Sequence, residues 1–131
     1  KNLRAFQGDL TAVDEDLAKL LGPHAGRTIY VVHPAFGYFA ASYGLRQEAL
    51  EFEGKAPSAK RLAELAQRAR AEGVRTIFYQ EQSSDRAARR LAAEIGADVV
   101  GLDPLARDYL ANLRRIGRAI NAALSNRPGE R

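Results

Sequence analysis

The chain has 131 residues and no cysteine, so it is long enough for one ordinary domain, and disulfides, thiolate metal sites and thiol catalysis are excluded. Its 20 Lys and Arg residues and 16 Asp and Glu residues are interleaved along the expected helices and leave a net charge of +4. We therefore expect a solvated mixed-charge surface and no nucleic-acid partner. No apolar run reaches the roughly 18 residues of a membrane span, so we expect no membrane insertion of this chain. Because it begins with Lys1 and lacks methionine, we expect a piece of a longer translation product.

Helical and strand patterns alternate along the chain. Apolar residues three and four positions apart predict a long first helix that ends at Gly22-Pro23: Leu3, Phe6, Leu10, Val13, Leu17 and Leu20. Short apolar runs predict four strands, at residues 28–32, 48–53, 74–79 and 98–102. Further helices are predicted at residues 35–42 and 59–72, from a cap at Ser83 or Ser84 to Gly96, and from about Tyr109 to Leu124.

Polar side chains follow several of these predicted strands. Strands separated by helices imply βαβ crossovers and a parallel sheet covered by helices, with all strand carboxyl ends along one edge. Ligands bind at that edge in open α/β sheets. His33 follows the first strand, Gln80 and Glu81 follow the third, and Asp103 follows the fourth. We therefore expect these four residues to share one rim.

Each of these residues also has a more ordinary interpretation. A histidine at a strand end is more often a surface or hydrogen-bonded residue than a ligand, and Asp103 before Pro104 is a common helix start. Glu81 is compatible with a solvated loop charge, and His24 is expected to have no specific role. The aromatic residues after His33 are expected to pack on the sheet as core: Phe36, Tyr38, Phe39 and Tyr43.

A resemblance to a known family emerges from motifs in a fixed order: His33-Pro-Ala-Phe-Gly-Tyr-Phe-Ala, Tyr43-Gly-Leu45, Pro57-Ser58, Ile77-Phe78-Tyr79-Gln80 and Leu102-Asp-Pro-Leu105. Nearly the whole chain resembles the C-terminal lobe of the zinc- and manganese-type (cluster A-I) substrate-binding proteins of ABC importers. The resemblance implies an α/β fold with a four-stranded, mainly parallel sheet flanked by helices. Residues 1–22 would be the end of a long helix linking two lobes, and residues 23–131 the C-terminal metal-binding lobe. The N-terminal lobe would be absent from this chain.

The resemblance also implies a metal site between the two lobes, made of three histidines and a carboxylate, or of two histidines and two carboxylates in manganese-type members. His33 matches the C-lobe histidine of zinc-type members, and Asp103 matches the C-lobe carboxylate. The other two histidines would belong to the missing lobe. Gln80 and Glu81 are candidates to contact these ligands without binding the metal themselves. Many relatives have Glu and Pro at these two positions, and many have Asp at the position of Pro34. Zinc is the expected metal and manganese the alternative.

The resulting expectation is high-affinity zinc binding and delivery to an ABC-importer membrane permease, with no enzymatic activity, because full coordination by protein leaves no activated water. The place of action would be the periplasm or another extracytoplasmic site, with a lipid anchor in a Gram-positive source. An uncovered stripe of Leu3, Phe6 and Leu10 favours contact with the missing lobe or with a second copy of the chain. The alternative function is a small α/β hydrolase-like enzyme that uses His33 and Asp103 as an acid-base pair.

Overall fold

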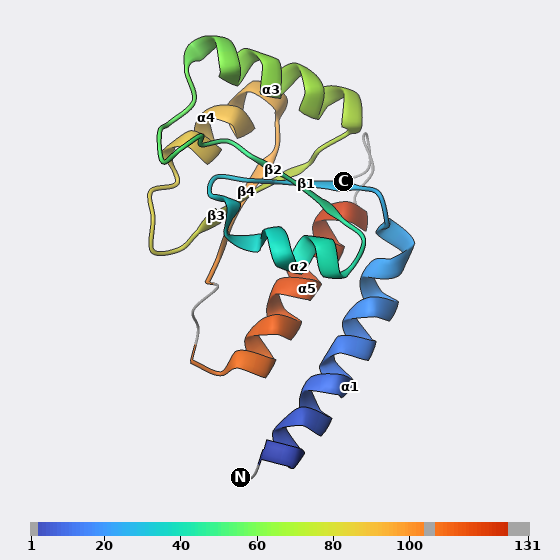
Figure 1. Ribbon diagram of the computed structural model, residues 1–131. Helices are drawn as coiled ribbons and strands as arrows, with labels where there is room; N and C mark the ends of the chain where they lie inside the picture. The colour runs from blue at the N-terminus through green and yellow to red at the C-terminus, as the bar shows by residue number, and fades with distance from the viewer. Residues whose placement is uncertain (1–2, 104–106, 126–131) are drawn as a thin grey trace.

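A four-stranded parallel sheet organises the chain (Figure 1), and the computed structural model describes residues 3–103 and 107–125. Its strands are β1 (Thr28–Val31), β2 (Arg46–Ala49), β3 (Thr76–Gln80) and β4 (Asp98–Leu102). They lie in the order β2-β1-β3-β4, and every neighbouring pair is parallel. The predicted α/β class and parallel sheet are therefore confirmed.

Helices cover both faces of this sheet (Figure 1). One face carries α1 (Leu3–Leu21), α2 (Gly37–Ser42) and α5 (Tyr109–Ser125), and the other carries α3 (Ala59–Glu72) and α4 (Arg86–Ile95). The side chains of β1 alternate between the two cores, because successive residues of a strand point to opposite faces. Ile29 and Val31 join the first core, and Tyr30 and Val32 join the second.

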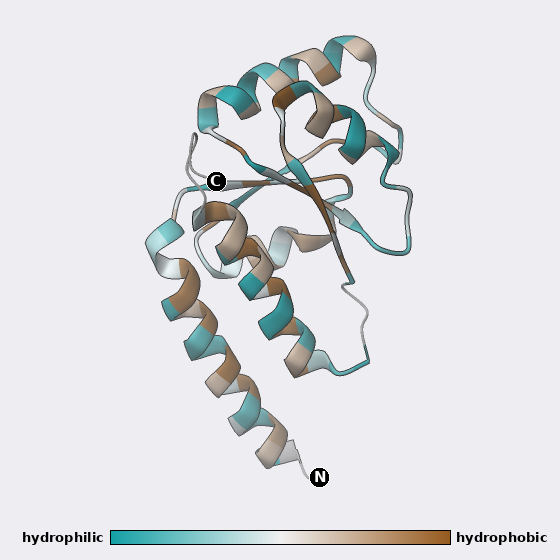
Figure 2. Cartoon of the chain, turned by 180° about the vertical axis from the view of Figure 1, so that it is seen from behind, coloured by the Kyte–Doolittle hydropathy of each residue, from teal (hydrophilic) through white to brown (hydrophobic). Residues whose placement is uncertain are grey.

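Helix α1 packs closely against α5 with its carboxyl-terminal half and extends beyond the sheet with its amino-terminal half (Figure 1). Val13, Leu17 and Leu21 are buried. A Cβ atom added to Gly117 of α5 would lie only 2.2 Å from Leu17 Cδ2, so glycine permits this close crossing. Of the predicted uncovered stripe, Phe6 is 39% exposed, Leu10 is partly buried against the core, and the side chain of Leu3 lies outside the described residues. Figure 2 shows the alternation of apolar and polar residues along this helix.

The bounds of β2 and β3 differ most from the prediction, and β1 ends at Val31, one residue before the predicted end. Strand β2 was predicted at residues 48–53 but spans Arg46–Ala49, because it runs in register with β1 from Thr28↔Arg46 to Val31↔Ala49. Strand β3 was predicted from residue 74 and begins at Thr76. The delay arises at the end of α3, where Gly73 has φ 72° and the Val74 amide still donates to the Ala69 carbonyl at 2.9 Å.

The segment after β1 is only partly the buried helix that was predicted. It begins with a 3₁₀ turn, η2 (Pro34–Phe36), before α2 starts. Phe36 and Phe39 are buried, as expected for core residues, but Tyr38 is 67% exposed. The prediction for Tyr38 is wrong because helical rotation turns this position outward while Phe39 and Ala40 face the sheet.

The helix ends follow the predicted capping signals only in part. Ser58 Oγ accepts a hydrogen bond from the Arg61 amide and caps α3, as predicted. The prediction of Ser83 or Ser84 as the cap of α4 is wrong, because the N-cap position is occupied by Asp85, although Ser84 Oγ accepts from the Arg86 amide in the turn before the helix. Helix α4 ends at Gly96, which has φ 70°. Across residues 3–103 and 107–125, no helix combines the length and the apolarity needed to cross a membrane.

Candidate metal centre

The carboxyl ends of the four strands bring the predicted site residues to one edge of the sheet. Glu51 follows β2, His33 follows β1, Glu81 follows β3 and Asp103 follows β4. Neighbouring strands lie about 4.8 Å apart, so His33 and Asp103 are separated by β3 and roughly 10 Å along the edge. The topology therefore places the two predicted ligands on one rim. Among the described residues, no three or more His, Cys, Asp or Glu side chains are grouped closely enough to share a metal ion.

His33 stands at the point where β1 gives way to η2. Its backbone is extended (φ −105°, ψ 147°), which is the conformation favoured before a proline such as Pro34. Its side chain is 31% exposed, and its Nδ1 atom lies 2.8 Å from Oε1 of Glu51. The Nδ1 edge of the ring therefore faces a carboxylate, and Nε2 is the nitrogen left for another ligand.

Glu51 is a residue of this edge that the sequence prediction missed. Its amide donates to the Val32 carbonyl at 3.0 Å, which holds it directly beside the end of β1. Its side chain is 18% exposed. The signal that could have found Glu51 is the pairing of the first two strands. Val31 pairs with Ala49, so Glu51, two positions past β2, lies level with His33, two positions past β1.

Asp103 is held by two side-chain amides at the other end of the edge. Gln82 Nε2 donates to Asp103 Oδ1 at 2.6 Å, and Asn112 Nδ2 donates to the Asp103 backbone carbonyl at 2.5 Å. Asn112 is only 4% exposed and also accepts from Arg115 Nη1 at 2.9 Å. The carboxylate is thus tied to the loop after β3 and its backbone to α5. The helix-start interpretation of Asp103-Pro104 involves residues outside the described part of the chain, since residues 104–106 are not described.

The two predicted supporting residues, Gln80 and Glu81, lie on β3 and directly after it. Gln80 is half-buried and Glu81 is exposed. The Glu81 amide donates to the Leu102 carbonyl at 2.9 Å, and a Cβ atom on Gly101 would come within 2.9 Å of Glu81 Cγ. Glu81 therefore lies over β4. The residue of this loop with a hydrogen bond to the predicted carboxylate ligand is the next one, Gln82.

Comparison with known families decides where this chain belongs. Residues 1–123 match the family model described as zinc-uptake complex component A, periplasmic (ZnuA). The chain is a member of the ZnuA family. The predicted resemblance is therefore confirmed on independent grounds.

Named relatives of this ZnuA-family chain bind zinc. The zinc-binding protein AdcA of Streptococcus pyogenes is 32% identical over 106 residues, which are 79% of this chain and 21% of AdcA. A crystal structure of ZnuA superposes with a TM-score of 0.91 at 39% identity, over 95% of this chain and 49% of that one. A ZnuA deletion mutant with zinc bound gives a TM-score of 0.88 at 38% identity, over 97% of this chain and 49% of that one. The chain thus spans about half of these ZnuA structures and about a fifth of AdcA.

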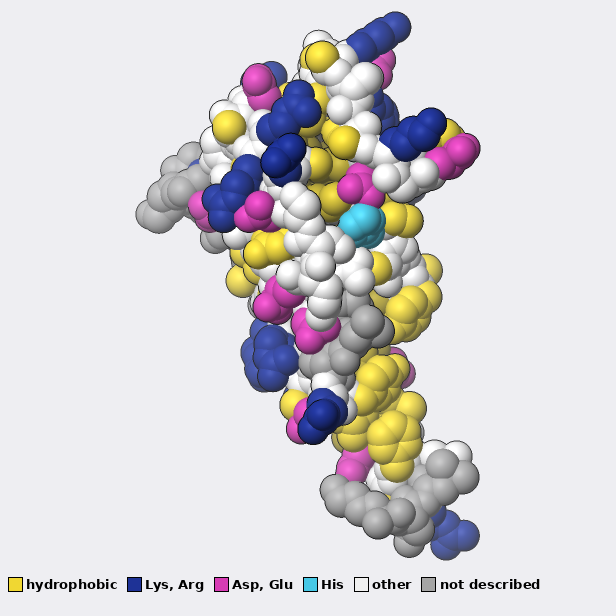
Figure 3. All heavy atoms as spheres, turned by 90° about the vertical axis from the view of Figure 1, so that its left-hand side faces the viewer, with side chains coloured by type: hydrophobic (Ala, Val, Ile, Leu, Met, Phe, Trp, Pro, Cys, Tyr) yellow, Lys and Arg dark blue, Asp and Glu magenta, His cyan; other side chains and the backbone are white. Residues whose placement is uncertain are grey.

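A second feature of this ZnuA-family chain is an apolar surface formed by α1, α2 and α5. Figure 3 shows apolar side chains gathered on the lower half of one face. Tyr38 and Tyr109 are 67% and 45% exposed and line a shallow pocket there with Leu10. Tyr43 donates from its hydroxyl to Asp14 Oδ1 at 2.7 Å, and burial together with this bond raises the pKa of Tyr43. The bond between Tyr43 and Asp14 therefore joins α1 to the residue that follows α2, beside the pocket that Tyr38 and Tyr109 line.

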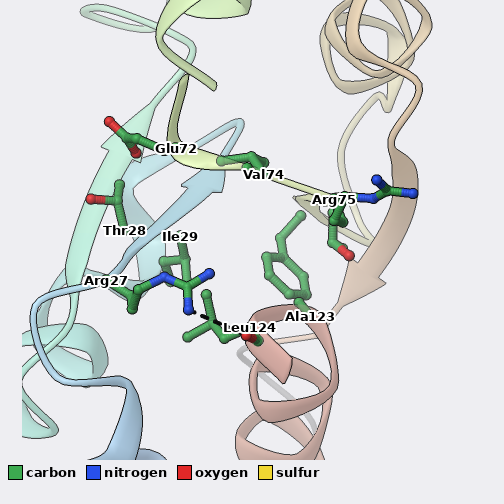
Figure 4. Close-up of a pocket in the computed structure, with 11 residues that line it drawn as sticks. Arg27, Thr28, Ile29, Glu72, Val74, Arg75, Ala123 and Leu124 are labelled. Atoms are coloured by element: carbon green, nitrogen blue, oxygen red, sulfur yellow. Dashed lines mark hydrogen bonds between the residues drawn. The ribbon is translucent and has the colours of Figure 1, made fainter. Parts of the chain in front are cut away.

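The opposite edge of the sheet carries a small pocket of a different kind (Figure 4). It lies where β1 and β3 begin, and its lining includes Arg27, Glu72 and Arg75. Arg27 Nη1 donates to the Leu124 carbonyl at 3.3 Å. Burial raises the pKa of Tyr30, whose hydroxyl donates to Glu72 Oε1 at 3.3 Å. These contacts join the helices to the sheet and are remote from the edge that carries His33.

His24 has a specific contact, contrary to the expectation. Its Nε2 atom lies 2.9 Å from Asn121 Oδ1 of α5. His24 ends the 3₁₀ turn η1 (Gly22–His24), which follows α1. The contact therefore ties the connection between α1 and β1 to α5, and His24 belongs to the structural framework of the fold.

Proposed function

We propose that this chain is the metal-binding C-terminal lobe of a zinc carrier, with His33 and Asp103 as its zinc ligands. The observation that carries the proposal is the position of both residues on one edge of a ZnuA-family sheet. Zinc accepts imidazole nitrogen and carboxylate oxygen at about 2.0–2.2 Å. The donor set thus suits zinc, and the imidazole favours zinc over manganese, which prefers oxygen ligands.

Two ligands leave a tetrahedral zinc ion with two open positions, which we assign to an N-terminal lobe. In this proposal residues 1–22 are the end of the linking helix and residues 23–131 form the C-terminal lobe. The chain's coverage of 49% of the ZnuA structure is consistent with one lobe of two. The isolated lobe is then expected to bind zinc weakly and to complete the coordination with water, buffer or a neighbouring chain.

The proposed role of the complete protein is delivery of zinc to an ABC-importer permease outside the cytoplasm, with a lipid anchor if the source is Gram-positive. The family description, which places its members in the periplasm, supports this location. A carrier needs full coordination by protein, whereas a catalytic zinc keeps an open position. Nδ1 of His33 lies against Glu51, and Asp103 Oδ1 accepts from Gln82, so the geometry gives no support to the hydrolase alternative with a His33 and Asp103 pair.

The test is titration calorimetry with zinc chloride on this chain and on three variants. We expect one-to-one binding that His33→Ala and Asp103→Ala each weaken at least tenfold, because each removes a direct ligand. His24→Ala is the matched control, since it removes the other histidine and should leave zinc binding unchanged. Tight one-to-one binding that survives in both ligand variants would refute the assignment.

The apolar surface of α1 and α2 supports a partner as well, either the missing lobe or a second copy of this chain. Phe6 and Tyr38 are exposed on it. Light scattering over a range of protein concentrations measures the mass directly. We expect the average mass to rise with concentration, and a constant monomer mass would contradict self-association through this surface.

A further inference from the structure

We propose that Glu51 is a positioning residue for His33: its carboxylate fixes the proton of the imidazole on Nδ1 and so presents Nε2 to the zinc ion. The inference rests on the proposed function, because it assigns a role to Glu51 toward the zinc ligand His33. Glu51 follows β2, whereas the predicted ligands and supporting residues come from β1, β3 and β4 or directly after them. The proposal therefore adds the remaining strand to the site.

The contact itself is short and sheltered. Glu51 Oε1 is 2.8 Å from His33 Nδ1, and the two side chains are 18% and 31% exposed. Glu51 Oε1 is buried, and within the described residues it has no aligned hydrogen-bond donor. A buried carboxylate oxygen without a donor is costly. A small rotation of the imidazole that aligns Nδ1–H with this oxygen is therefore favourable.

The chemistry of imidazole then sets the role of each nitrogen. A neutral ring carries its proton on one nitrogen and a lone pair on the other. A carboxylate is an acceptor only, so it stabilises the proton on the nitrogen that faces it, here Nδ1. The lone pair is left on Nε2, the nitrogen that a metal can bind. Metal-binding histidines commonly have a carboxylate in this position, which fixes the tautomer and raises the basicity of the ligating nitrogen.

The neighbouring carboxylate on β2 is already occupied, which singles out Glu51. Glu48 is bound by Arg61 at 2.9 Å and by Arg68 at 2.5 Å. These two arginines come from α3, and the Glu48 side chain is 25% exposed, close to the 18% of Glu51. Glu48 therefore provides a matched control: a half-buried acidic residue of the same strand region with partners other than His33.

The first measurement is the tautomer of His33 from the ¹⁵N chemical shifts of its ring nitrogens, recorded without metal at about pH 8, above the ordinary pKa of free imidazole. We expect the Nδ1–H form in the unmodified chain and a change to mainly Nε2–H, the form that an unrestrained imidazole prefers, in Glu51→Ala. Glu51→Gln, whose amide oxygen can still accept from Nδ1–H, should restore part of the Nδ1–H population. Glu48→Ala should leave the tautomer unchanged.

The second measurement is zinc affinity by calorimetry on the same set with zinc chloride. Glu51→Ala should weaken binding about 10- to 100-fold, the usual effect of losing such a partner, and Glu51→Gln should weaken it less. An Nε2–H tautomer in the unmodified chain, or zinc affinity in Glu51→Ala equal to that in Glu48→Ala, would overturn the proposal. Weaker zinc binding in Glu51→Ala with an unchanged tautomer would also overturn it, because Glu51 would then act on zinc by a route other than the His33 tautomer.

The two proposals fail in distinguishable ways. If His33→Ala weakens zinc binding and the Glu51 variants do not, the positioning role is wrong and the zinc site stands. If His33→Ala and Asp103→Ala bind zinc like the unmodified chain, the proposed function itself is wrong, whatever the tautomer of His33.

Discussion

The two predicted ligands on the carboxyl edge of the sheet, His33 and Asp103, are held by opposite kinds of contact. His33, a neutral ligand, lies against the carboxylate of Glu51 at 2.8 Å. Asp103, an anionic ligand, receives neutral amides from Gln82 and Asn112. If zinc binds as proposed, the charges of the ion, Asp103 and Glu51 add to zero. A partly buried edge can therefore attract a doubly charged cation with two carboxylates and without a larger cluster of unpaired negative charges.

The two ends also differ in their connection to the core. Asn112 is 4% exposed and sits on α5 within the apolar layer, so the backbone of Asp103 is anchored deep in the lobe. Glu51 lies past the end of β2, which is an outer strand of the sheet. The carboxylate end should therefore depend on the stability of the lobe, and the histidine end on a local contact.

The largest expected effect on stability comes from the buried Asn112. Asn112→Ala removes the amide bonded to the Asp103 carbonyl and should lower the free energy of unfolding by about 1–3 kcal/mol, because buried polar partners are left unpaired. Urea denaturation measures this loss. Asn121→Ala, a half-buried position on the same helix that contacts His24, is the control and should cost less. Equal losses in the two variants would show that Asn112 anchors Asp103 no more firmly than a half-buried asparagine of the same helix anchors its partner.

A smaller effect is expected at Gln82. This side chain is exposed, and Gln82→Ala should leave the free energy of unfolding within about 0.5 kcal/mol of the unmodified chain. It should weaken zinc binding about tenfold, since it frees the Asp103 carboxylate from its orienting donor. Calorimetry with zinc chloride tests this, with Gln67→Ala on the exposed face of α3 as the control. If affinity is unchanged, Asp103 does not need Gln82 to face the metal.

The smallest expected effect is the coupling between the two ends. Glu51 and Gln82 follow β2 and β3, which are separated by β1 and hence by about 10 Å. The losses of zinc-binding free energy in Glu51→Ala and Gln82→Ala should therefore add in the double variant to within about 0.5 kcal/mol. A larger coupling energy, measured by the same calorimetry, would show that the histidine end and the carboxylate end of the edge do not act independently.

The framework of the fold was largely predictable because it depends on local patterns. Strand β4 was predicted at residues 98–102 and has these bounds, since an apolar run between Gly96 and Asp103 is short and clearly delimited. The outer strand β2 was misplaced, because only its pairing with β1 determines where it begins. Tyr38 was misassigned because an apolar run alone does not show which of its residues the rotation of α2 turns away from the sheet.

The site was predictable in part. His33 and Asp103 could be proposed from strand ends and a family resemblance, and the sheet topology places both on one edge. Glu51 and Gln82 were missed because their contacts depend on which strands are neighbours and on loop conformation. A sequence pattern reports which side chains follow a strand, whereas the register between strands decides which of them touch.

Helix α1 has a mechanical consequence. Its 19 residues span roughly 28 Å at 1.5 Å per residue, and the burial of Val13, Leu17 and Leu21 confines its firm support to the carboxyl-terminal half. The amino-terminal half extends away from the sheet, and α1 approaches α5 closely where Leu17 lies against Gly117. A small change in the angle between the two helices at this point displaces the amino-terminal end of α1 by a larger distance, so the residue at position 117 influences where that end lies.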